Sequence, residues 1–158
     1  MKFLKSREEL LKQKEYLSWK RKNVSIRGIA KFGELNKGGA SMGEGLYTAC
    51  LSNKEMARKY GKVYFVVNAR PKKPLKFRSF WYWEIFLQNL MIKVTGDQFY
   101  KVKDFYDKTT IKDEIQKLGY DGIEIVGREY VIYDPKDVLY FDNEKELEEY
   151  FNQINLHE

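Results

Sequence analysis

The segment from Lys62 to Asn68 constrains the fold of this chain more than any other. A nearly continuous apolar run fills it: Val63, Tyr64, Phe65, Val66 and Val67. A strand with one face in water alternates apolar and polar residues, whereas a continuous run is typical of a strand covered on both faces. We therefore expect a sheet with other elements packed against both faces. Pro71 and Pro74 should end this strand, because proline cannot donate to the ladder.

The segments around it alternate between strand and helix patterns. Short apolar or alternating stretches predict further strands at 24–30, 46–50, 123–126, 130–133 and 138–141. Apolar residues at spacings of three and four, together with cap signals, predict helices at 7–22, 52–60, 79–94, 110–118 and 143–154. Ser6, Ser52 and Asn143 each stand three residues before a glutamate, which is the capping-box spacing of a helix start. The predicted fold class is α+β.

The length of the chain fits one compact domain. A chain of 158 residues with 43% hydrophobic and 16% aromatic content can bury one sizeable core. No repeat, linker or low-complexity segment divides the sequence. We expect a single domain over residues 1–158.

The charge balance favours an acidic partner. Lys and Arg total 29 against 23 Asp and Glu, so the net charge is +6 and the pI is near 9.2, which suits nucleic acid or an anionic cofactor. The charge is uneven, since residues 1–22 are basic and the chain is acidic from Asp134 onward. Five further basic residues lie together with no acid among them: Arg70, Lys72, Lys73, Lys76 and Arg78. Such runs are either solvated faces or a surface that faces a polyanion.

Rare residue types exclude several kinds of site. The single cysteine, Cys50, rules out a disulfide framework and fits a reducing compartment. The single histidine, His157, lies next to the C-terminal residue, so we expect no metal site and no Ser/His or Cys/His pair. The most apolar stretch, 85–94, is too short to span a bilayer, and the first residues lack the apolar core of a signal peptide. We expect a cytoplasmic protein without membrane contact, in the cytoplasm of a host cell if it is delivered there.

A glycine-rich segment at 36–45 predicts a loop. Four of its ten residues are glycines, so its backbone can approach a ligand closely. It lacks the Gly-Lys-Ser/Thr ending of a Walker loop and the three spaced glycines of a dinucleotide fingerprint. The loop is therefore either a plain connection or one wall of a different kind of site.

Four motifs, in order along the chain, resemble a known family. They are Arg27-Gly28, Gly43-Glu44-Gly45-Leu46-Tyr47-Thr48-Ala49, a helix end at Ala57-Arg58-Lys59-Tyr60, and Glu129-Tyr130-Val131-Ile132-Tyr133-Asp134. In this order and spacing, from Ile26 to Phe141, the chain resembles the NAD-dependent ADP-ribosyltransferase superfamily. The pattern is mixed, because the Gly-x-Gly-x-Tyr and Glu-Tyr-x-x-Tyr-Asp strands look like the poly(ADP-ribose) polymerase and diphtheria-toxin branch. Arg27 is instead similar to the arginine of the cholera-toxin-like branch.

This resemblance implies an ADP-ribosyltransferase-like split sheet, with two small sheets around an NAD cleft and helices outside. It implies that Glu129 is the catalytic glutamate and that Tyr47 and Tyr60 enclose the nicotinamide ring. Gly28 would hold the carboxamide through its backbone, and Arg27 would support the phosphates. Two further cofactor-binding positions are Gly45 and Ser52.

The chemistry of these residues agrees with a transferase. Breaking the bond between nicotinamide and ribose builds positive charge on the ribose, and one nearby carboxylate stabilises that charge. We therefore expect a mono-ADP-ribosyltransferase that uses NAD as a substrate and modifies a macromolecular acceptor, either protein or nucleic acid. Gly127 stands where arginine-modifying relatives have Glu or Gln, which disfavours arginine as the acceptor. The compact size and the missing secretion signal favour a toxin, phage-encoded or effector enzyme.

Two other interpretations stay open. One is a catalytically silent module of the same fold that binds nucleic acid through a basic face. The other is an RNA-directed relative such as the tRNA phosphotransferases, although their arginine and histidine set is not visible in the chain. For the transferase, residues 70–78 and the basic first helix would form a positive rim beside the cleft, suited to a nucleic-acid acceptor.

Overall fold

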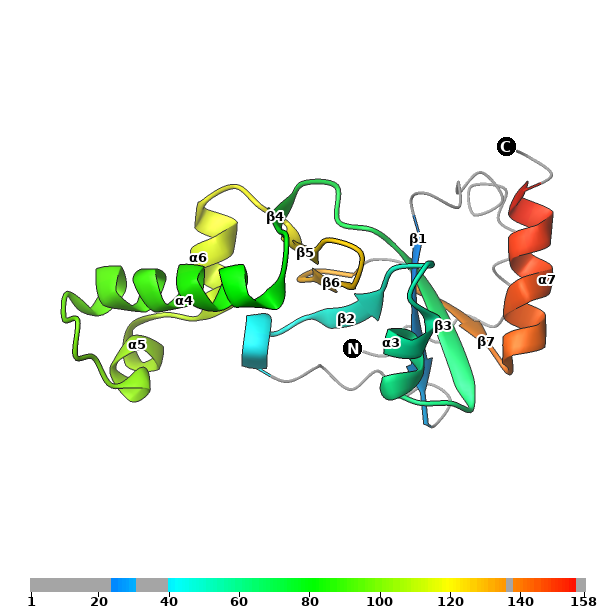
Figure 1. Cartoon of the computed structure of the whole chain (residues 1–158), viewed down its shortest axis with the longest axis horizontal. Coiled ribbons are helices and arrows are strands. Elements are labelled where there is room, and N and C mark those ends of the chain that lie inside the picture. The colour runs from blue at the N-terminus through cyan, green and yellow to red at the C-terminus, as the bar shows by residue number, and fades with distance from the viewer. Residues whose placement is uncertain (1–23, 31–39, 136–137, 156–158) are drawn as a thin grey trace.

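The computed structural model describes residues 24–30, 40–135 and 138–155. Within these ranges the chain forms a seven-stranded mixed sheet and five α-helices, which confirms the α+β class (Figure 1). The predicted helix at 7–22 and residues 36–39 of the glycine-rich segment lie outside the described residues. No helix in the described ranges is both long enough and apolar enough to cross a membrane.

Six of the seven strands fall where the sequence predicts strands. They are β1 (Val24–Ile29), β2 (Leu46–Ala49), β3 (Tyr64–Ala69), β5 (Gly122–Ile125), β6 (Glu129–Ile132) and β7 (Val138–Phe141). The seventh, β4 (Pro74–Phe77), is not predicted, because the prolines mark this segment as the end of β3. The structure accommodates Pro74 because β4 is an edge strand that begins at the proline and pairs only with β5, in parallel.

The sheet narrows to one residue pair near its middle. Its strand order is β4-β5-β6-β2-β1-β3-β7. β1 and β2 are in register only at Ile26 and Ala49, whereas every other neighbouring pair is in register at four positions or more. In Figure 1, β2 runs across the view while β1 stands upright, so the two halves of the sheet turn away from each other at this joint. The described residues thus form one continuous sheet with a narrow joint, and not the two small sheets that the family resemblance implies.

Three helices confirm the predicted positions: α4 (Phe80–Thr95), α6 (Ile111–Lys117) and α7 (Glu144–Asn155). α7 also has the predicted cap, since the Asn143 side chain accepts a hydrogen bond from the Glu146 N–H at 2.9 Å. α5 (Val102–Lys108) is not predicted. It buries only Phe105, so its apolar pattern is too short to show a helical period.

α3 (Lys54–Lys59) starts one residue later than its predicted cap allows. The Asn53 N–H donates to the Cys50 carbonyl at 2.9 Å, and this turn leaves Ser52 exposed and outside the helix. The Asn53 side chain then accepts a hydrogen bond from the Met56 N–H at 3.2 Å and caps the helix. The prediction that Ser52 caps α3 is therefore wrong. Serine and asparagine cap helices about equally well, and the turn before α3 decides between them.

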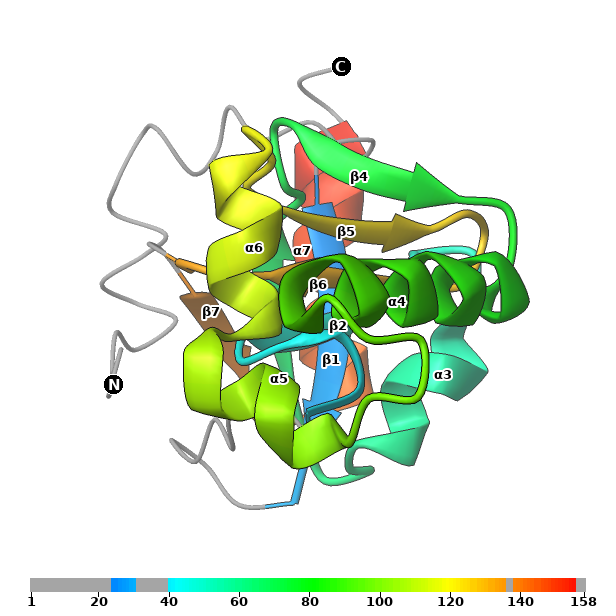
Figure 2. The same cartoon turned by 90° about the vertical axis from the view of Figure 1, so that its left-hand side faces the viewer.

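Both faces of the sheet are buried at β3, as its continuous apolar run predicts. Phe65 and Val67 belong to one core cluster together with residues of α7, whereas Val66 between them belongs to a second cluster with Ile132 and Tyr140. A third cluster lies between the sheet and α4, α5 and α6, which Figure 2 shows gathered on one side of the sheet. The candidate site lies where this third cluster meets the joint between β1 and β2.

Candidate active site

Glu129 is the first residue of β6 and is enclosed by the sheet. Its side chain is 5% exposed, and its register partners are Ile125 of β5 and Ala49 of β2. The three-residue turn before it requires a glycine, because Gly127 has the left-handed φ of 73°. The Arg128 N–H closes the turn by donating to the Ile125 carbonyl at 3.0 Å. The hairpin therefore holds this carboxylate inside the protein and not on a solvated strand edge.

Tyr60 donates the hydrogen bond that Glu129 accepts. The distance from its hydroxyl oxygen to Glu129 Oε2 is 2.8 Å. Tyr60 is the C-cap residue of α3, so this helix delivers the phenol to the carboxylate. Burial, followed by the negative charge of Glu129, raises the pKa of Tyr60 well above its ordinary value. The phenol therefore stays protonated at neutral pH and remains a hydrogen-bond donor.

Arg27 adds a buried positive charge beside Tyr60. Its guanidinium carbon lies 4.5 Å from the centre of the Tyr60 ring, and its Nη1 donates to the Tyr47 carbonyl at 3.2 Å. The side chain is 5% exposed, and burial lowers the pKa of the guanidinium. Its Nε has no hydrogen-bond partner in the described part of the chain, and no carboxylate there forms an ion pair with it. Because burying an unpaired cation is costly, this position fits an anionic ligand.

The Tyr47 side chain is held in place by the loop before β2. Its hydroxyl accepts a hydrogen bond from the Met42 N–H at 2.9 Å and donates one to the Gly43 carbonyl at 2.7 Å. The loop before β2 therefore binds the hydroxyl end of the Tyr47 side chain. Trp83 of α4 fastens the same loop by donating from Nε1 to the Ser41 carbonyl at 3.0 Å. The Tyr47 ring is almost fully buried in the core cluster beneath α4. Burial is the main cause that raises the pKa of Tyr47, and the charge of Glu129 contributes less.

Close backbone packing requires glycine at positions 28 and 45. A Cβ on Gly28 would lie 1.8 Å from the Gly61 carbonyl oxygen, so β1 can pass the turn after α3 only with glycine here. A Cβ on Gly45 would lie 2.7 Å from the Ile132 carbonyl oxygen. Gly28 is buried and lies two residues from Ile26, where β1 is in register with β2. Ser52, which we also expect to bind the cofactor, is exposed and lies in the turn before α3.

Arg128 is a site residue to which the sequence assigns no role. Its Nε lies 3.5 Å from Glu129 Oε1, and its guanidinium carbon lies 5.9 Å from the centre of the Phe80 ring. Phe80 is the first residue of α4, so Arg128 connects the carboxylate to the start of this helix. The signal in the sequence is the basic residue directly before the candidate glutamate. The structure thus brings together Glu129, Tyr60, Arg27, Tyr47 and Arg128 from four separate segments, since Arg128 and Glu129 are neighbours in the chain.

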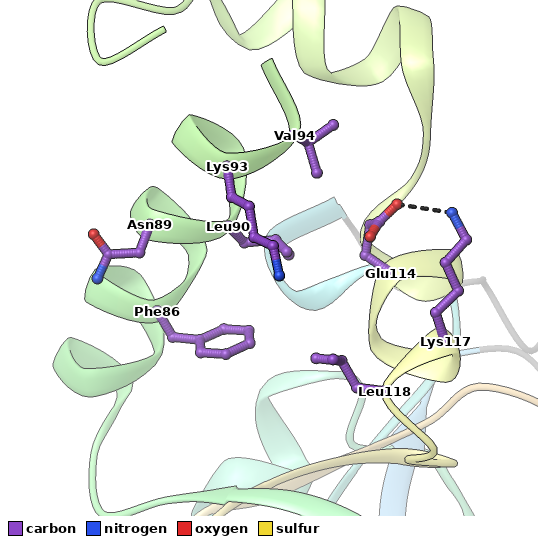
Figure 3. Close-up of a pocket in the computed structure, with 8 residues that line it drawn as sticks. All are labelled: Phe86, Asn89, Leu90, Lys93, Val94, Glu114, Lys117 and Leu118. Atoms are coloured by element: carbon purple, nitrogen blue, oxygen red, sulfur yellow. Dashed lines mark hydrogen bonds and ion pairs between the residues drawn. The ribbon is translucent and has the colours of Figure 1, made fainter. Parts of the chain in front are cut away.

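A groove lies elsewhere, between α4 and α6 (Figure 3). It encloses about 530 Å³, and its lining includes the apolar side chains of Phe86, Leu90 and Leu118. The Lys117 Nζ donates to Glu114 at 3.0 Å on its rim, and this hydrogen bond is the main cause that lowers the pKa of Glu114. None of the charged side chains that line the groove is buried, whereas Glu129 and Arg27 are, so the chemistry of this chain is better sought at Glu129.

Comparison with models of known protein families, with curated proteins and with solved structures finds no match for the chain. The function is therefore argued from the site. A buried carboxylate, a phenol that donates to it and a buried guanidinium with no ion pair in the described part of the chain can together bind an anion and stabilise positive charge close to it.

Proposed function

We propose that this protein is a mono-ADP-ribosyltransferase that uses NAD as its substrate and Glu129 as its catalytic carboxylate. The supporting observation is the group of three side chains at the joint of the sheet. Tyr60 donates to the buried Glu129 at 2.8 Å, and the guanidinium of Arg27 lies 4.5 Å from the Tyr60 ring with its Nε unpaired among the described residues. NAD offers the matching chemistry, since its pyrophosphate is an anion and its ribose becomes positive during the reaction.

In the proposed reaction, the bond between the ribose C1′ and the nicotinamide nitrogen breaks. Nicotinamide leaves with the electron pair of that bond, and a nucleophile of the acceptor forms the new bond to C1′ and loses its proton. Positive charge on the ribose is largest between these events. A unit pair at ~4 Å and an effective dielectric constant of ~20 is worth about 4 kcal/mol, or nearly a thousandfold in rate. A single carboxylate at the position of Glu129 therefore supplies a useful part of the catalysis.

The other residues have separate roles in this proposal. The guanidinium of Arg27 binds the pyrophosphate, because its fork of donors suits two phosphate oxygens. Tyr60 holds the carboxylate through its hydroxyl and presents its ring beside the nicotinamide, with Tyr47 as the opposite wall. Gly28 offers its backbone to the carboxamide. Gly45 does not contact NAD in this proposal; it lets β2 and β6 come close enough to place Tyr47.

The second candidate function is a catalytically silent module that binds nucleic acid. The basic side chains of β4 and the residues after it, together with the net charge of +6, favour it. This candidate leaves the buried pair of Glu129 and Tyr60 without a use, so the transferase is the better conclusion.

Glu129→Gln tests the proposal, because it keeps the size of the side chain and removes its charge. We expect nicotinamide release from NAD to fall by about a hundredfold or more, as expected when transition-state charge is no longer stabilised. NAD affinity measured by isothermal titration should change little.

The matched control is Glu124→Gln on the neighbouring strand β5, whose register partners are Lys76 and Tyr130 and not Glu129. This variant should release nicotinamide at the rate of the unchanged protein. If Glu129→Gln is as active as Glu124→Gln, Glu129 is a buried structural carboxylate and the proposed mechanism is wrong.

A further inference from the structure

Exposed aromatic and basic side chains gather where β4 ends and α4 begins. Trp81 and Tyr82, in the first turn of α4, are 61% and 47% exposed, and their ring centres lie 5.0 Å apart. Lys76 and Arg78 precede them and are also exposed. Lys76, Phe77, Arg78 and Tyr82 line a hollow of about 300 Å³. Figure 2 shows β4 turning directly into α4 at this point.

This surface continues from the candidate site. Phe77 of β4 is in register with Ile125 of β5, which is in register with Glu129 of β6. Neighbouring strands lie about 4.8 Å apart, so the end of β4 is roughly 10 Å from the start of β6. Arg128 spans part of that distance, since its guanidinium lies near both the Glu129 carboxylate and the Phe80 ring. An acceptor held against Trp81 and Tyr82 could therefore extend to Glu129.

The basic run at 70–78 does not form one continuous rim. Arg70 is held on the protein, because its Nε donates to the Val24 carbonyl at 3.0 Å and its guanidinium lies 5.2 Å from the Tyr130 ring centre. Lys72 and Lys73 precede the far end of β4, where their backbone N–H groups donate to the Asp121 carboxylate at 2.8 and 2.9 Å.

Only Lys76 and Arg78 of this run stand at the end of β4 nearer Glu129. Their acidic neighbours are Glu124, in register with Lys76, and the exposed Glu84 of α4. Arg128 adds a third cation at this end, close to Phe80.

We infer that this surface, formed by Lys76, Arg78, Trp81, Tyr82 and Arg128, binds a single-stranded nucleic acid and holds it as the acceptor of the transfer. The inference rests on the proposed function. Two exposed rings beside three cations match unpaired bases that stack and phosphates that pair with positive charge. A duplex hides the faces of its bases, so it cannot stack on these rings in the same way. Base stacking also explains why a charged surface keeps a tryptophan in water.

Binding is tested first, with the full chain and no NAD. The probes are fluorescein-labelled oligothymidylate and oligouridylate of about twelve nucleotides, a length within the usual range for such sites, and a duplex of the same length. Both single strands should bind more tightly than the duplex. Trp81→Ala should weaken single-strand binding by on the order of tenfold, as expected when one ring no longer stacks on a base.

Phe99→Ala is the control, because Phe99 is an aromatic residue that is more exposed than Trp81 and lies in the connection between α4 and α5. It should bind like the unchanged protein, and thermal unfolding should show that both variants are folded. Equal binding by Trp81→Ala and Phe99→Ala, or no binding of either single strand at low salt, overturns the inference. A duplex that binds as tightly as the single strands overturns it as well.

The two ends of β4 give a second comparison at constant charge. Lys76→Ala with Arg78→Ala should reduce the slope of log affinity against log salt by about 1.4, or roughly 0.7 for each phosphate that the protein no longer neutralises. Lys72→Ala with Lys73→Ala removes the same charge from the other end of the strand and should leave most of the slope. Equal effects of the two pairs would show general attraction to a positive protein and would overturn the assigned surface.

The acceptor role is tested with labelled NAD, each single strand, and lysate protein. Label on an oligonucleotide that decreases in Trp81→Ala supports the inference. Label on protein alone, with nicotinamide released, overturns the inference and leaves the proposed function standing. A chain that releases no nicotinamide under any condition overturns the proposed function, and the acceptor role with it, even if the oligonucleotides bind.

Discussion

Tyr60 makes two kinds of contact in the candidate site, one through its hydroxyl and one through its ring. Its hydroxyl donates to Glu129 and its ring lies under the guanidinium of Arg27, so it touches both charges of the site. From the sequence we predict a role for the ring alone, either as a stacking surface for nicotinamide or as part of the core. Its half-buried ring also packs against the core cluster beneath α4, so both uses are present.

Two substitutions separate the hydroxyl from the ring. Tyr60→Phe removes only the hydrogen bond to Glu129, and a hydrogen bond to a charged group contributes about 1.5–3 kcal/mol. We expect slower nicotinamide release with nearly unchanged NAD affinity. Tyr60→Ala also removes the ring and should weaken NAD binding by about 1–3 kcal/mol in isothermal titration. Equal NAD affinity of Tyr60→Ala and the unchanged protein would show that the ring is only part of the core.

At the scale of elements, α3 and the β5–β6 hairpin place residues that are far apart in the chain. α3 ends at Tyr60, and the hairpin begins β6 at Glu129. The Cys50 N–H donates to the Arg128 carbonyl at 3.2 Å, which ties the segment before α3 to the hairpin. The geometry of the carboxylate and the phenol therefore depends on how α3 starts.

Asn53→Ala tests this dependence. It removes the side-chain cap of α3 and should lower the free energy of unfolding by about 1 kcal/mol, measured by urea denaturation. Ser52→Ala is the adjacent control and should change the stability by less than about 0.5 kcal/mol, because an exposed turn residue outside the helix contributes little. The reverse order of effects would mean that Ser52 caps the helix in solution.

At the scale of the whole molecule, much of the interior is built from tyrosines that must stay neutral. Burial raises the pKa of Tyr130, Tyr133 and Tyr150, as it does for Tyr47 and Tyr60. An unfolded tyrosine ionises near pH ~10. The unfolded chain therefore loses protons at a pH where the folded protein still keeps them, and this difference couples stability to pH.

We predict a loss of stability in alkali. The contribution of these tyrosines to the free energy of unfolding is complete below about pH 10 and falls as the pH rises above it, by up to ~1.4 kcal/mol per pH unit for each tyrosine. Urea denaturation between about pH 9 and pH 11 measures the slope. Tyr133→Phe should show a smaller slope, although it also loses the hydrogen bond to the Met42 carbonyl at 2.9 Å. Identical slopes for this variant and the unchanged protein would contradict the prediction.

The sequence predicts most of the strands and helices because local patterns report local structure. The continuous apolar run of β3 and the capping pair of Asn143 and Glu146 need no knowledge of the rest of the fold. The failures have tertiary causes. β4 is a strand because β5 lies beside it, and α5 is anchored through Phe105 alone. The start of α3 depends on the turn at Cys50.

From the sequence alone, a strand is predicted directly after Glu129, a helix that ends at Tyr60 and a strand that contains Arg27, and the structure has all three elements. The family resemblance implies that these three residues share a site, but their contacts come from the tertiary structure, because no local pattern records proximity between residues this far apart. The tertiary structure also decided that Gly28 is required by the Gly61 carbonyl, and that Lys76 and Arg78 lie near Glu129 while Lys72 and Lys73 do not. Strand register, which joins segments across the sheet, is the physical reason for the difference.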